Sequence, residues 1–340
     1  MVSYIFGLTY SEIEELAPGF PKYKYSQLFD WIYKKRIFDP DKMTNISGEF
    51  RNVLKQKTII DYPAIVEEKT TSDNTTKFLF KLHDGNFVEA VIIDSVKRKT
   101  FCLSSQVGCP IQCRFCASGM YGLKRNLDPG EIVGQFLLLA NFLKKTPDNV
   151  VFMGIGEPLL NFKNLTDSLN IICSSEYINF SQRRITISTS GIPEFIRKLA
   201  GLKKQYNLAI SLHAADDITR AKLIPDKARF PIKDIIEAAL EYFHKTGRLI
   251  TIEYTFIEGI NDSFLQAQQL AKIAKTLRAK VNLIPYNVIK GGVFSRPKDR
   301  ICISFAEKLK ELGVPVTFRL EKGSNIDAAC GQLRANKISE

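Results

Sequence analysis

The sequence predicts an α/β protein whose parallel sheet curls into a partial barrel. Two features of the chain indicate this fold. From about residue 100 onward, short runs rich in β-branched residues alternate with amphipathic segments of helical length, which is the pattern of strand–helix repeats. The unusual polar residues fall almost always at the C-terminal ends of the expected strands, and barrel enzymes build their sites on that face.

The composition is that of a globular protein with a basic surface. A chain of 340 residues is long enough to bury a large core, and we expect one large domain with a smaller one beside it. The net charge of +12 favours a polyanionic partner, such as RNA, DNA or a membrane surface.

Three observations predict a cytoplasmic location. The N-terminus has no basic region before its short apolar run and soon turns acidic, so we expect no signal peptide. No uninterrupted apolar stretch is long enough to cross a bilayer. The 7 cysteines are an odd number, and their clustering is unlike a secreted disulfide framework.

Residues 1–95 are expected to form a small accessory domain of helices and hairpins. A first helix would have Ser11 as its N-cap and would end at Pro18. Residues 22–37 carry aromatic and aliphatic side chains at helical spacing, and such a stripe is more often core than a ligand platform. Residues 60–93 alternate apolar and polar side chains around two turn sequences, which predicts a small antiparallel sheet.

The barrel is expected to span residues 96–320, followed by a C-terminal loop and tail at 321–340. The expected strands begin at Thr100, Asn149, Arg184, Asn207, Leu249, Lys280 and Val314. Amphipathic segments between them predict helices that begin near Gly130, Pro231 and Phe264.

Residues 102–116 hold four cysteines in the string CLSSQVGCPIQCRFC. Cys109, Cys113 and Cys116 have the spacing C-x3-C-x2-C, and Cys102 precedes them. Iron–sulfur clusters and zinc both prefer thiolate ligands, so three cysteines on one loop indicate a cluster with one iron left open. The spacing alone leaves two alternatives, a zinc site closed by a remote fourth ligand and buried free thiols.

Small and polar residues at the ends of the expected strands are candidates for binding a cofactor. Gly154, Gly156 and Glu157 follow the second strand, but G-x-G without a third glycine is a weak nucleotide signal. Further candidates end the third, fourth and sixth strands: Ser188, Ser211, Leu212, His213 and Asn287. Singly, such residues are more often caps, turns or structural histidines, and only their shared place on one barrel face favours a site.

Several strings together resemble the RlmN/Cfr family of radical S-adenosylmethionine RNA adenine methyltransferases. They are the C-x3-C-x2-C loop with Phe115 before its last cysteine, CLSSQVGC, GLKRNL, and NIDAACGQL near the C-terminus. The resemblance covers nearly the whole chain. It implies a six-stranded partial barrel with a [4Fe-4S] cluster on Cys109, Cys113 and Cys116. It also implies that the strand-end candidates other than Gly154 contact S-adenosylmethionine.

The resemblance further implies how the reaction proceeds. Cys330 would take a methyl group, and a 5′-deoxyadenosyl radical, made at the cluster from a second S-adenosylmethionine, would remove hydrogen from it. The resulting carbon radical would add to adenine, Glu89 would accept the ring proton, and Cys102 would form a disulfide with Cys330 that frees the base. Without the family, Glu89 is better explained as an exposed residue of an edge strand.

The implied substrates are 23S rRNA and certain tRNAs, methylated at carbon 2 of adenosine. Methylation at carbon 8, as in Cfr-type enzymes that confer antibiotic resistance, is the alternative within the family. A non-catalytic, zinc-stabilised RNA-binding protein is the alternative from another class, and it would give Cys330 no role. We also expect an electron donor such as flavodoxin or ferredoxin, a monomeric state and no membrane partner.

Overall fold

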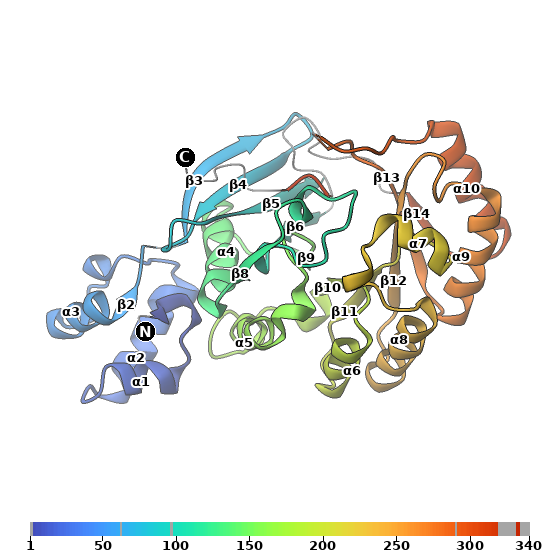
Figure 1. Ribbon diagram of the computed structural model, residues 1–340. Coiled ribbons are helices and arrows are strands. Elements are labelled where there is room, and N and C mark those ends of the chain that lie inside the picture. Colours follow the sequence, from blue (N-terminus) through green and yellow to red (C-terminus); the bar gives the residue numbers. More distant parts are fainter. Residues whose placement is uncertain (1–2, 62, 96–97, 290, 319–330, 334–340) are drawn as a thin grey trace.

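One ten-stranded sheet curves through the molecule in the computed structural model of the chain (Figure 1). The structure describes residues 3–61, 63–95, 98–289, 291–318 and 331–333. The sheet has a parallel part and an antiparallel part, and the two are continuous.

The parallel part consists of the strands that the sequence predicts for the barrel. They are β6 (Arg98–Cys102), β9 (Asn149–Phe152), β10 (Ile185–Thr189), β11 (Asn207–Ser211), β12 (Ile250–Phe256), β13 (Lys280–Pro285) and β14 (Val316–Phe318). Each pairs in parallel with the next of these strands along the chain. The predicted α/β fold with a partial barrel is therefore confirmed.

Helices connect these strands and cover the outer, convex face of the sheet in Figure 1. They are α4 (Pro129–Phe142), α5 (Phe162–Cys173), α6 (Pro193–Gly201), α8 (Ile232–Thr246), α9 (Phe264–Thr276) and α10 (Asp299–Glu311). The shorter α7 (Asp217–Leu223) follows β11 at the C-terminal ends of the strands. Residues from the strands and from the inner sides of these helices form one large apolar core, which includes Cys302.

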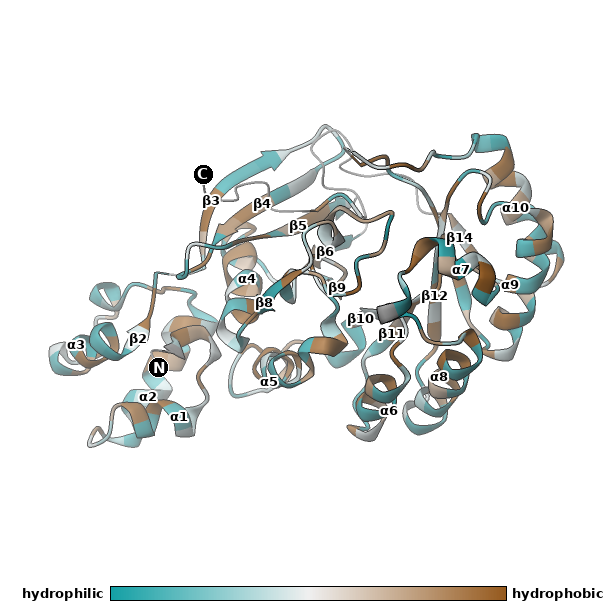
Figure 2. Cartoon of the chain, viewed as in Figure 1, coloured by the Kyte–Doolittle hydropathy of each residue, from teal (hydrophilic) through white to brown (hydrophobic). Residues whose placement is uncertain are grey.

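Hydropathy follows this layering. Figure 2 shows apolar residues along the strands and polar residues over the outer turns of helices such as α10. Within the described ranges, no helix combines the length and the apolar character that a membrane span requires.

The predicted antiparallel strands extend the barrel sheet. They are β3 (Ala64–Thr70), β4 (Thr75–Lys81) and β5 (Phe87–Ser95), and β5 pairs with β6 in antiparallel fashion. Both faces of β5 are covered, because its outer face packs into the main core and its inner face into a second apolar cluster. The expected antiparallel pairing is present, but it forms no separate sheet. The domain boundary at residue 95 remains a prediction.

The N-terminal segments form a small helical layer that shares the main apolar core with α4. They are β1 (Ser3–Tyr4), α1 (Tyr10–Leu16), α2 (Lys22–Phe29), the π-helix η2 (Asp30–Lys34), α3 (Gly48–Lys57) and β2 (Thr58–Ile59). The prediction of Ser11 as N-cap is wrong. Thr9 is the N-cap, because its amide and hydroxyl both donate to the Glu12 carboxylate, at 2.7 and 2.6 Å. The aromatic stripe of residues 22–37 is core, as predicted.

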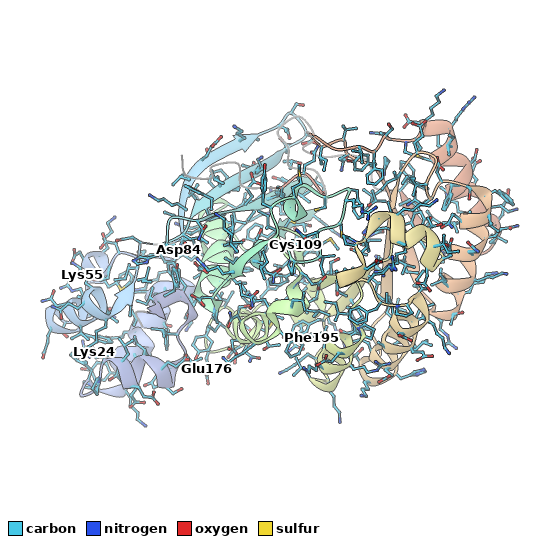
Figure 3. All side chains as sticks on the ribbon, viewed as in Figure 1. Lys24, Lys55, Asp84, Cys109, Glu176 and Phe195 are labelled. Carbon is cyan, nitrogen blue, oxygen red and sulfur yellow. The ribbon has the colours of Figure 1, made fainter. Side chains whose placement is uncertain are left out.

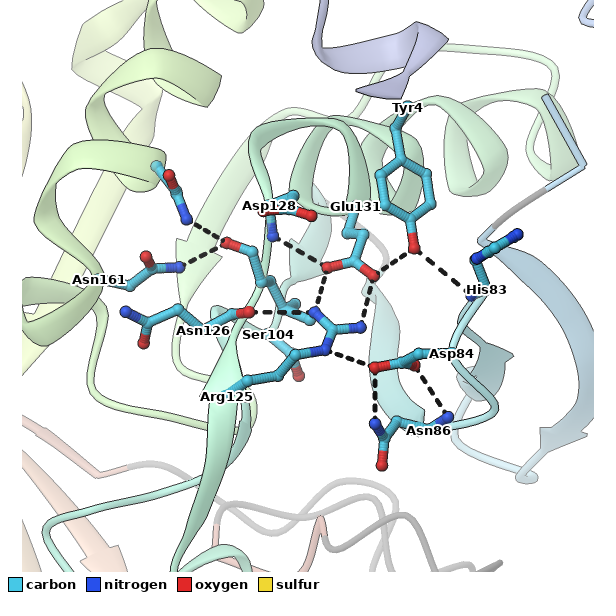
Figure 4. A network of polar contacts seen from close by, with 12 residues as sticks. Tyr4, His83, Asp84, Asn86, Ser104, Arg125, Asn126, Asp128, Glu131 and Asn161 are labelled. Atoms are coloured by element: carbon cyan, nitrogen blue, oxygen red, sulfur yellow. Dashed lines mark hydrogen bonds and ion pairs between the residues drawn. The ribbon is translucent and has the colours of Figure 1, made fainter. Parts of the chain in front are cut away.

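Arg125 ties four separate segments together (Figure 4). Its guanidinium binds both oxygens of Glu131 in α4, at 2.7 and 2.8 Å, and Asp84 in the β4–β5 turn at 2.6 Å. The Tyr4 hydroxyl donates to the same Glu131 carboxylate over 2.7 Å. Burial opposes ionisation of Asp84, yet hydrogen bonds from Arg125 and Asn86 lower the pKa of Asp84 to about 2. The network explains the structural need for the arginine in GLKRNL.

Replacing Arg125 with methionine should lower the free energy of unfolding by about 3 kcal/mol, because Glu131 would remain buried without its cation. The matched control is Lys163→Met, which breaks an exposed pair with Asp167 and should change stability by less than about 1 kcal/mol. Urea titrations of the two variants test this. Equal losses of unfolding free energy in the two variants would mean that the Arg125 network stabilises the fold no more than an exposed ion pair does.

Candidate active site

The cysteine motif lies on a loop held by a short antiparallel ribbon. In this ribbon β7 (Gln106–Gly108) pairs with β8 (Leu123–Asn126), and the Cys109 amide donates to the Gly122 carbonyl over 2.9 Å. Gly108 has a φ of +76°, and a Cβ at this position would lie 2.0 Å from the Gly122 oxygen. Only glycine allows the two strands to close here.

The three thiols of the motif face the same small space. Cys109, Cys113 and Cys116 pack against a buried apolar cluster that includes Phe115 and Tyr286. Burial raises the pKa of Cys109 to about 12. Burial, together with the negative charge of the other two thiolates, also raises the pKa of Cys113. In Figure 3, Cys109 lies near the centre of the molecule, away from Lys24 and Lys55 on the N-terminal helices.

This arrangement fits an iron–sulfur cluster better than a zinc ion. In a cluster each cysteine binds a separate iron, so three thiolates around one space leave the fourth iron open. Zinc would need four ligands within about 2.3 Å of one point. Among the described residues, no three His, Cys, Asp or Glu side chains come close enough to hold a single ion.

The thiols form one wall of a cavity at the C-terminal ends of the parallel strands. Most of the predicted cofactor-binding residues line it, namely Gly154, Gly156, Glu157, Ser188, Ser211 and His213. Leu212 instead packs into the main core, and Asn287 is buried but does not belong to the cavity wall. Residues that the sequence did not single out also line the cavity, among them Met153, Glu253, Thr255 and Tyr286.

Glu157 joins the ends of two neighbouring strands. Its carboxylate accepts hydrogen bonds from the Ser190 amide at 2.7 Å and from the Leu159 amide at 3.1 Å. Its own amide donates to the Gln106 side chain at 2.7 Å. Burial raises the pKa of Glu157, although these hydrogen bonds act in the opposite direction. Each carboxylate oxygen has two lone pairs, so Glu157 can also accept from an ammonium group in the cavity.

His213 is held as a neutral ring. Its φ of 57° lies in the left-handed region, and its Nδ1 accepts from the Thr255 amide over 3.1 Å, so Nε2 carries the hydrogen. Burial, with a smaller effect from the charge of Arg220, lowers the pKa of His213 to about 3. The ring packs edge-to-face on Phe115, with centroids 4.8 Å apart. His213 can therefore donate a hydrogen bond to a ligand and carries no positive charge near neutral pH.

Glu89 and Cys102 lie on the inner face of the sheet. Val91 of β5 pairs with Cys102 on one side and with Lys77 on the other, while Glu89 pairs with Leu79, so these side chains share one face. The Lys77 ammonium lies 3.0 Å from a Glu89 carboxylate oxygen, and the two side chains are only 14% and 6% exposed. The explanation of Glu89 as an exposed edge residue is wrong, because β5 lies between β4 and β6.

Lys77 is a site residue that the sequence did not reveal. The string TTKFLFK places its lysine on the same side of β4 as Leu79, two positions later, and Leu79 is buried. A lysine on the buried side of an alternating strand was the available signal.

The segment that follows Cys330 lies at the mouth of the barrel, which is the cavity at the C-terminal ends of the parallel strands. Gly331 lines the cavity, and its carbonyl accepts from the Ala117 amide of the cysteine loop over 2.7 Å. The Ser118 hydroxyl donates to the Leu333 carbonyl, and the Leu333 side chain belongs to the same apolar cluster as Cys102. Cys330 itself lies outside the described residues.

Two protein families match the chain. The Radical SAM superfamily matches residues 103–271, and the ribosomal RNA large subunit methyltransferase N-terminal domain matches residues 5–60.

Individual proteins match over nearly the full length. A probable dual-specificity RNA methyltransferase RlmN from Akkermansia muciniphila is 44% identical, covering 95% of this chain and 92% of its own length. Another from Pseudothermotoga lettingae is 42% identical, with 98% of each chain covered. The crystal structure of a radical SAM methyltransferase from Sphaerobacter thermophilus superposes with a TM-score of 0.94 at 40% identity, over 98% of this chain and 99% of that one. This chain belongs to the RlmN family of radical SAM RNA methyltransferases.

Proposed function

We propose that this protein methylates carbon 2 of an adenosine in 23S rRNA and in certain tRNAs, using S-adenosylmethionine. The dual specificity in the names of its relatives supports this reaction, as does the matched N-terminal domain of ribosomal RNA methyltransferases. The proposal rests on one observation, namely that three groups of residues lie together at the C-terminal ends of the barrel strands. The three motif thiols, the inner-face residues and the segment directly after Cys330 all converge there.

The cavity and its thiol wall are assigned to the two cofactors. Cys109, Cys113 and Cys116 would hold a [4Fe-4S] cluster, and the adjoining cavity would hold S-adenosylmethionine. Together these groups supply the radical chemistry that an unreactive ring carbon requires. We assign two molecules of S-adenosylmethionine to each turnover, one as methyl donor and one as radical source.

Residues around the cavity would orient the bound S-adenosylmethionine. Glu157 would accept hydrogen bonds from its amino group, because its carboxylate is fixed by two backbone amides. The hydroxyls of Ser188 and Ser211 lie 3.3 Å apart and would bind polar atoms of the ligand. The neutral ring of His213 would donate from Nε2.

Cys330 and Cys102 are assigned the sulfur chemistry, with Cys330 as methyl carrier and Cys102 as the releasing thiol. In the release step the Cys102 sulfur bonds to the Cys330 sulfur, and the bond between the Cys330 sulfur and the transferred carbon breaks. The electron pair of that bond stays on the carbon, which takes a proton and leaves as the methyl group of the base. The disulfide remains a prediction, because Cys330 lies outside the described residues.

Glu89 is assigned as acceptor of the ring proton. It lies on the same sheet face as Cys102, so a base linked to Cys330 and awaiting attack by Cys102 would lie near it. The Lys77 ammonium pairs with the Glu89 carboxylate at 3.0 Å.

The partners follow from this chemistry. The net charge of +12 suits an RNA substrate, and phosphate contacts should make binding strongly dependent on salt. We assign flavodoxin or ferredoxin as the class of electron donor, and a monomer as the working state.

Replacing Cys330 with alanine should abolish methylation of rRNA and leave RNA affinity within about twofold of the unchanged protein. Methylation is lost because the variant has no methyl carrier, and RNA affinity is kept because the basic surface that binds RNA is unchanged. Cys173→Ala is the matched control, since this half-buried cysteine ends α5 on the outer layer. Mass spectrometry of digested rRNA and gel-shift assays measure the two effects. Methylation by the Cys330 variant would rule out the methyl-carrier scheme.

Replacing Glu89 with glutamine should slow formation of methylated RNA about 10²- to 10⁴-fold, which is the usual contribution of a general base. Consumption of S-adenosylmethionine should continue, because the cavity is unchanged. Glu68→Gln on the exposed side of β3 should leave the rate unchanged. Single-turnover assays compare the variants, and a normal rate for Glu89→Gln would exclude the proton-acceptor role.

Turnover with S-adenosylmethionine that carries a trideuterated methyl group should give 2-methyladenosine containing fewer than three deuterium atoms. Loss of label is expected because hydrogen is removed from the methyl carbon before transfer. Chromatography against 2-methyladenosine and 8-methyladenosine standards identifies the methylated carbon, and mass spectrometry counts the deuterium atoms. An 8-methyladenosine product would assign the protein to the Cfr branch of chemistry instead.

A further inference from the structure

Arg220 is a fully buried cation at the mouth of the barrel. It lies on α7, and its side chain is completely inaccessible to solvent. Its guanidinium donates to the carbonyls of Leu212 at 3.3 Å, Phe230 at 3.1 Å and Ser190. None of the described carboxylates forms an ion pair with it. Carbonyl oxygens satisfy its hydrogen atoms, but they do not neutralise its charge.

A buried charge without a counter-ion is costly, and proteins seldom keep one that has no partner. Burial lowers the pKa of Arg220 to about 10, and Asp217 of the same helix acts on it electrostatically without forming an ion pair. The geometry places Arg220 close to the cysteine loop. Ser190, whose carbonyl accepts from the Arg220 guanidinium, lines the same cavity as the three motif thiols.

The packing of α7 explains this proximity. The amide of Arg114, in the cysteine loop, donates to the Leu223 carbonyl at the end of α7 over 3.0 Å. Leu223 and Ile224 share an apolar cluster with Phe115 and all three motif thiols. Arg220 lies one helical turn before these contacts. Helix α7 thus presents an unpaired positive charge to the loop that carries the cluster ligands.

We propose that Arg220 is the counter-cation of the iron–sulfur cluster and raises the reduction potential of the cluster. The inference rests on the cluster assigned under the proposed function and goes beyond it by naming the residue that sets the potential. Three thiolates make the site anionic, and reduction adds one more electron to it. A buried cation nearby stabilises the reduced form more than the oxidised form, so its removal should make reduction harder.

The competing explanation is that Arg220 serves only as a structural clamp. Its three acceptors lie after β10, after β11 and after α7, so it joins three loops of the barrel mouth. A lysine at this position would keep the charge and lose most of the fork of hydrogen bonds, whereas glutamine would keep a donor and lose the charge. The two substitutions therefore separate charge from clamping.

The test is an EPR-monitored redox titration of the anaerobically reconstituted full-length protein, without S-adenosylmethionine or RNA. Arg220→Gln should lower the equilibrium constant for reduction at least tenfold, which is about 59 mV for a one-electron couple. Arg220→Lys should keep the unchanged protein's potential. Arg248→Gln is the matched control, since this half-buried arginine precedes β12 at the opposite end of the barrel and should also leave the potential unchanged.

Each outcome decides the proposal. An unchanged potential in Arg220→Gln overturns it, and so does an equal fall in Arg220→Lys. If the glutamine variant retains no cluster, the lysine variant decides alone. A normal cluster and potential with lysine support the charge role, and loss of the cluster with lysine supports the clamp. If the unchanged protein itself binds no iron–sulfur cluster, the proposed function fails rather than the role of Arg220.

Discussion

Compensation of buried charge is the constraint on which this active site depends. Radical chemistry needs a cavity sheltered from water, and the apolar cluster around the cysteine loop provides that shelter. The same shelter penalises every charge inside it. The cost of burying a charge is offset in a different way at each ionisable side chain of the site. Two backbone amides stabilise Glu157, Lys77 pairs with Glu89, and His213 stays neutral.

The continuity of the sheet positions the two halves of the chemistry. Strand β6 pairs with β9 on one side and with β5 on the other, so the cavity of the parallel strands and the inner face of the antiparallel strands adjoin. Paired strands lie about 4.8 Å apart, and the register Val91–Cys102 fixes the distance of Glu89 from Cys102. The hairpin strands therefore carry part of the site proposed for catalysis, whatever the boundary of the N-terminal domain.

Much of the site could be predicted because its signals are local. The cysteine spacing, the strand periodicity and the residues at strand ends all depend on near neighbours in the chain. Lys77 and Arg220 could not be identified in this way. Their importance comes from which residues lie near them after folding. Lys77 pairs with Glu89 on the neighbouring strand, and Arg220 lies on helix α7, which packs against the cysteine loop. Likewise, the sequence offers a capping box to Thr9 with Glu12 and to Ser11 with Glu14, and the fold forms the first.

The contacts of residues 331–333 limit where Cys330 can act. Gly331 is bonded to Cys330 and is anchored by its carbonyl to Ala117, one residue beyond the last cluster cysteine. The Leu333 carbonyl accepts from the Ser118 hydroxyl, and the Leu333 side chain belongs to the same apolar cluster as Cys102. One short segment therefore contacts the cysteine loop and joins the cluster that contains Cys102. These contacts place the chain directly after Cys330 at the cysteine loop and in the apolar cluster that contains Cys102, which supports the methyl-carrier scheme proposed above.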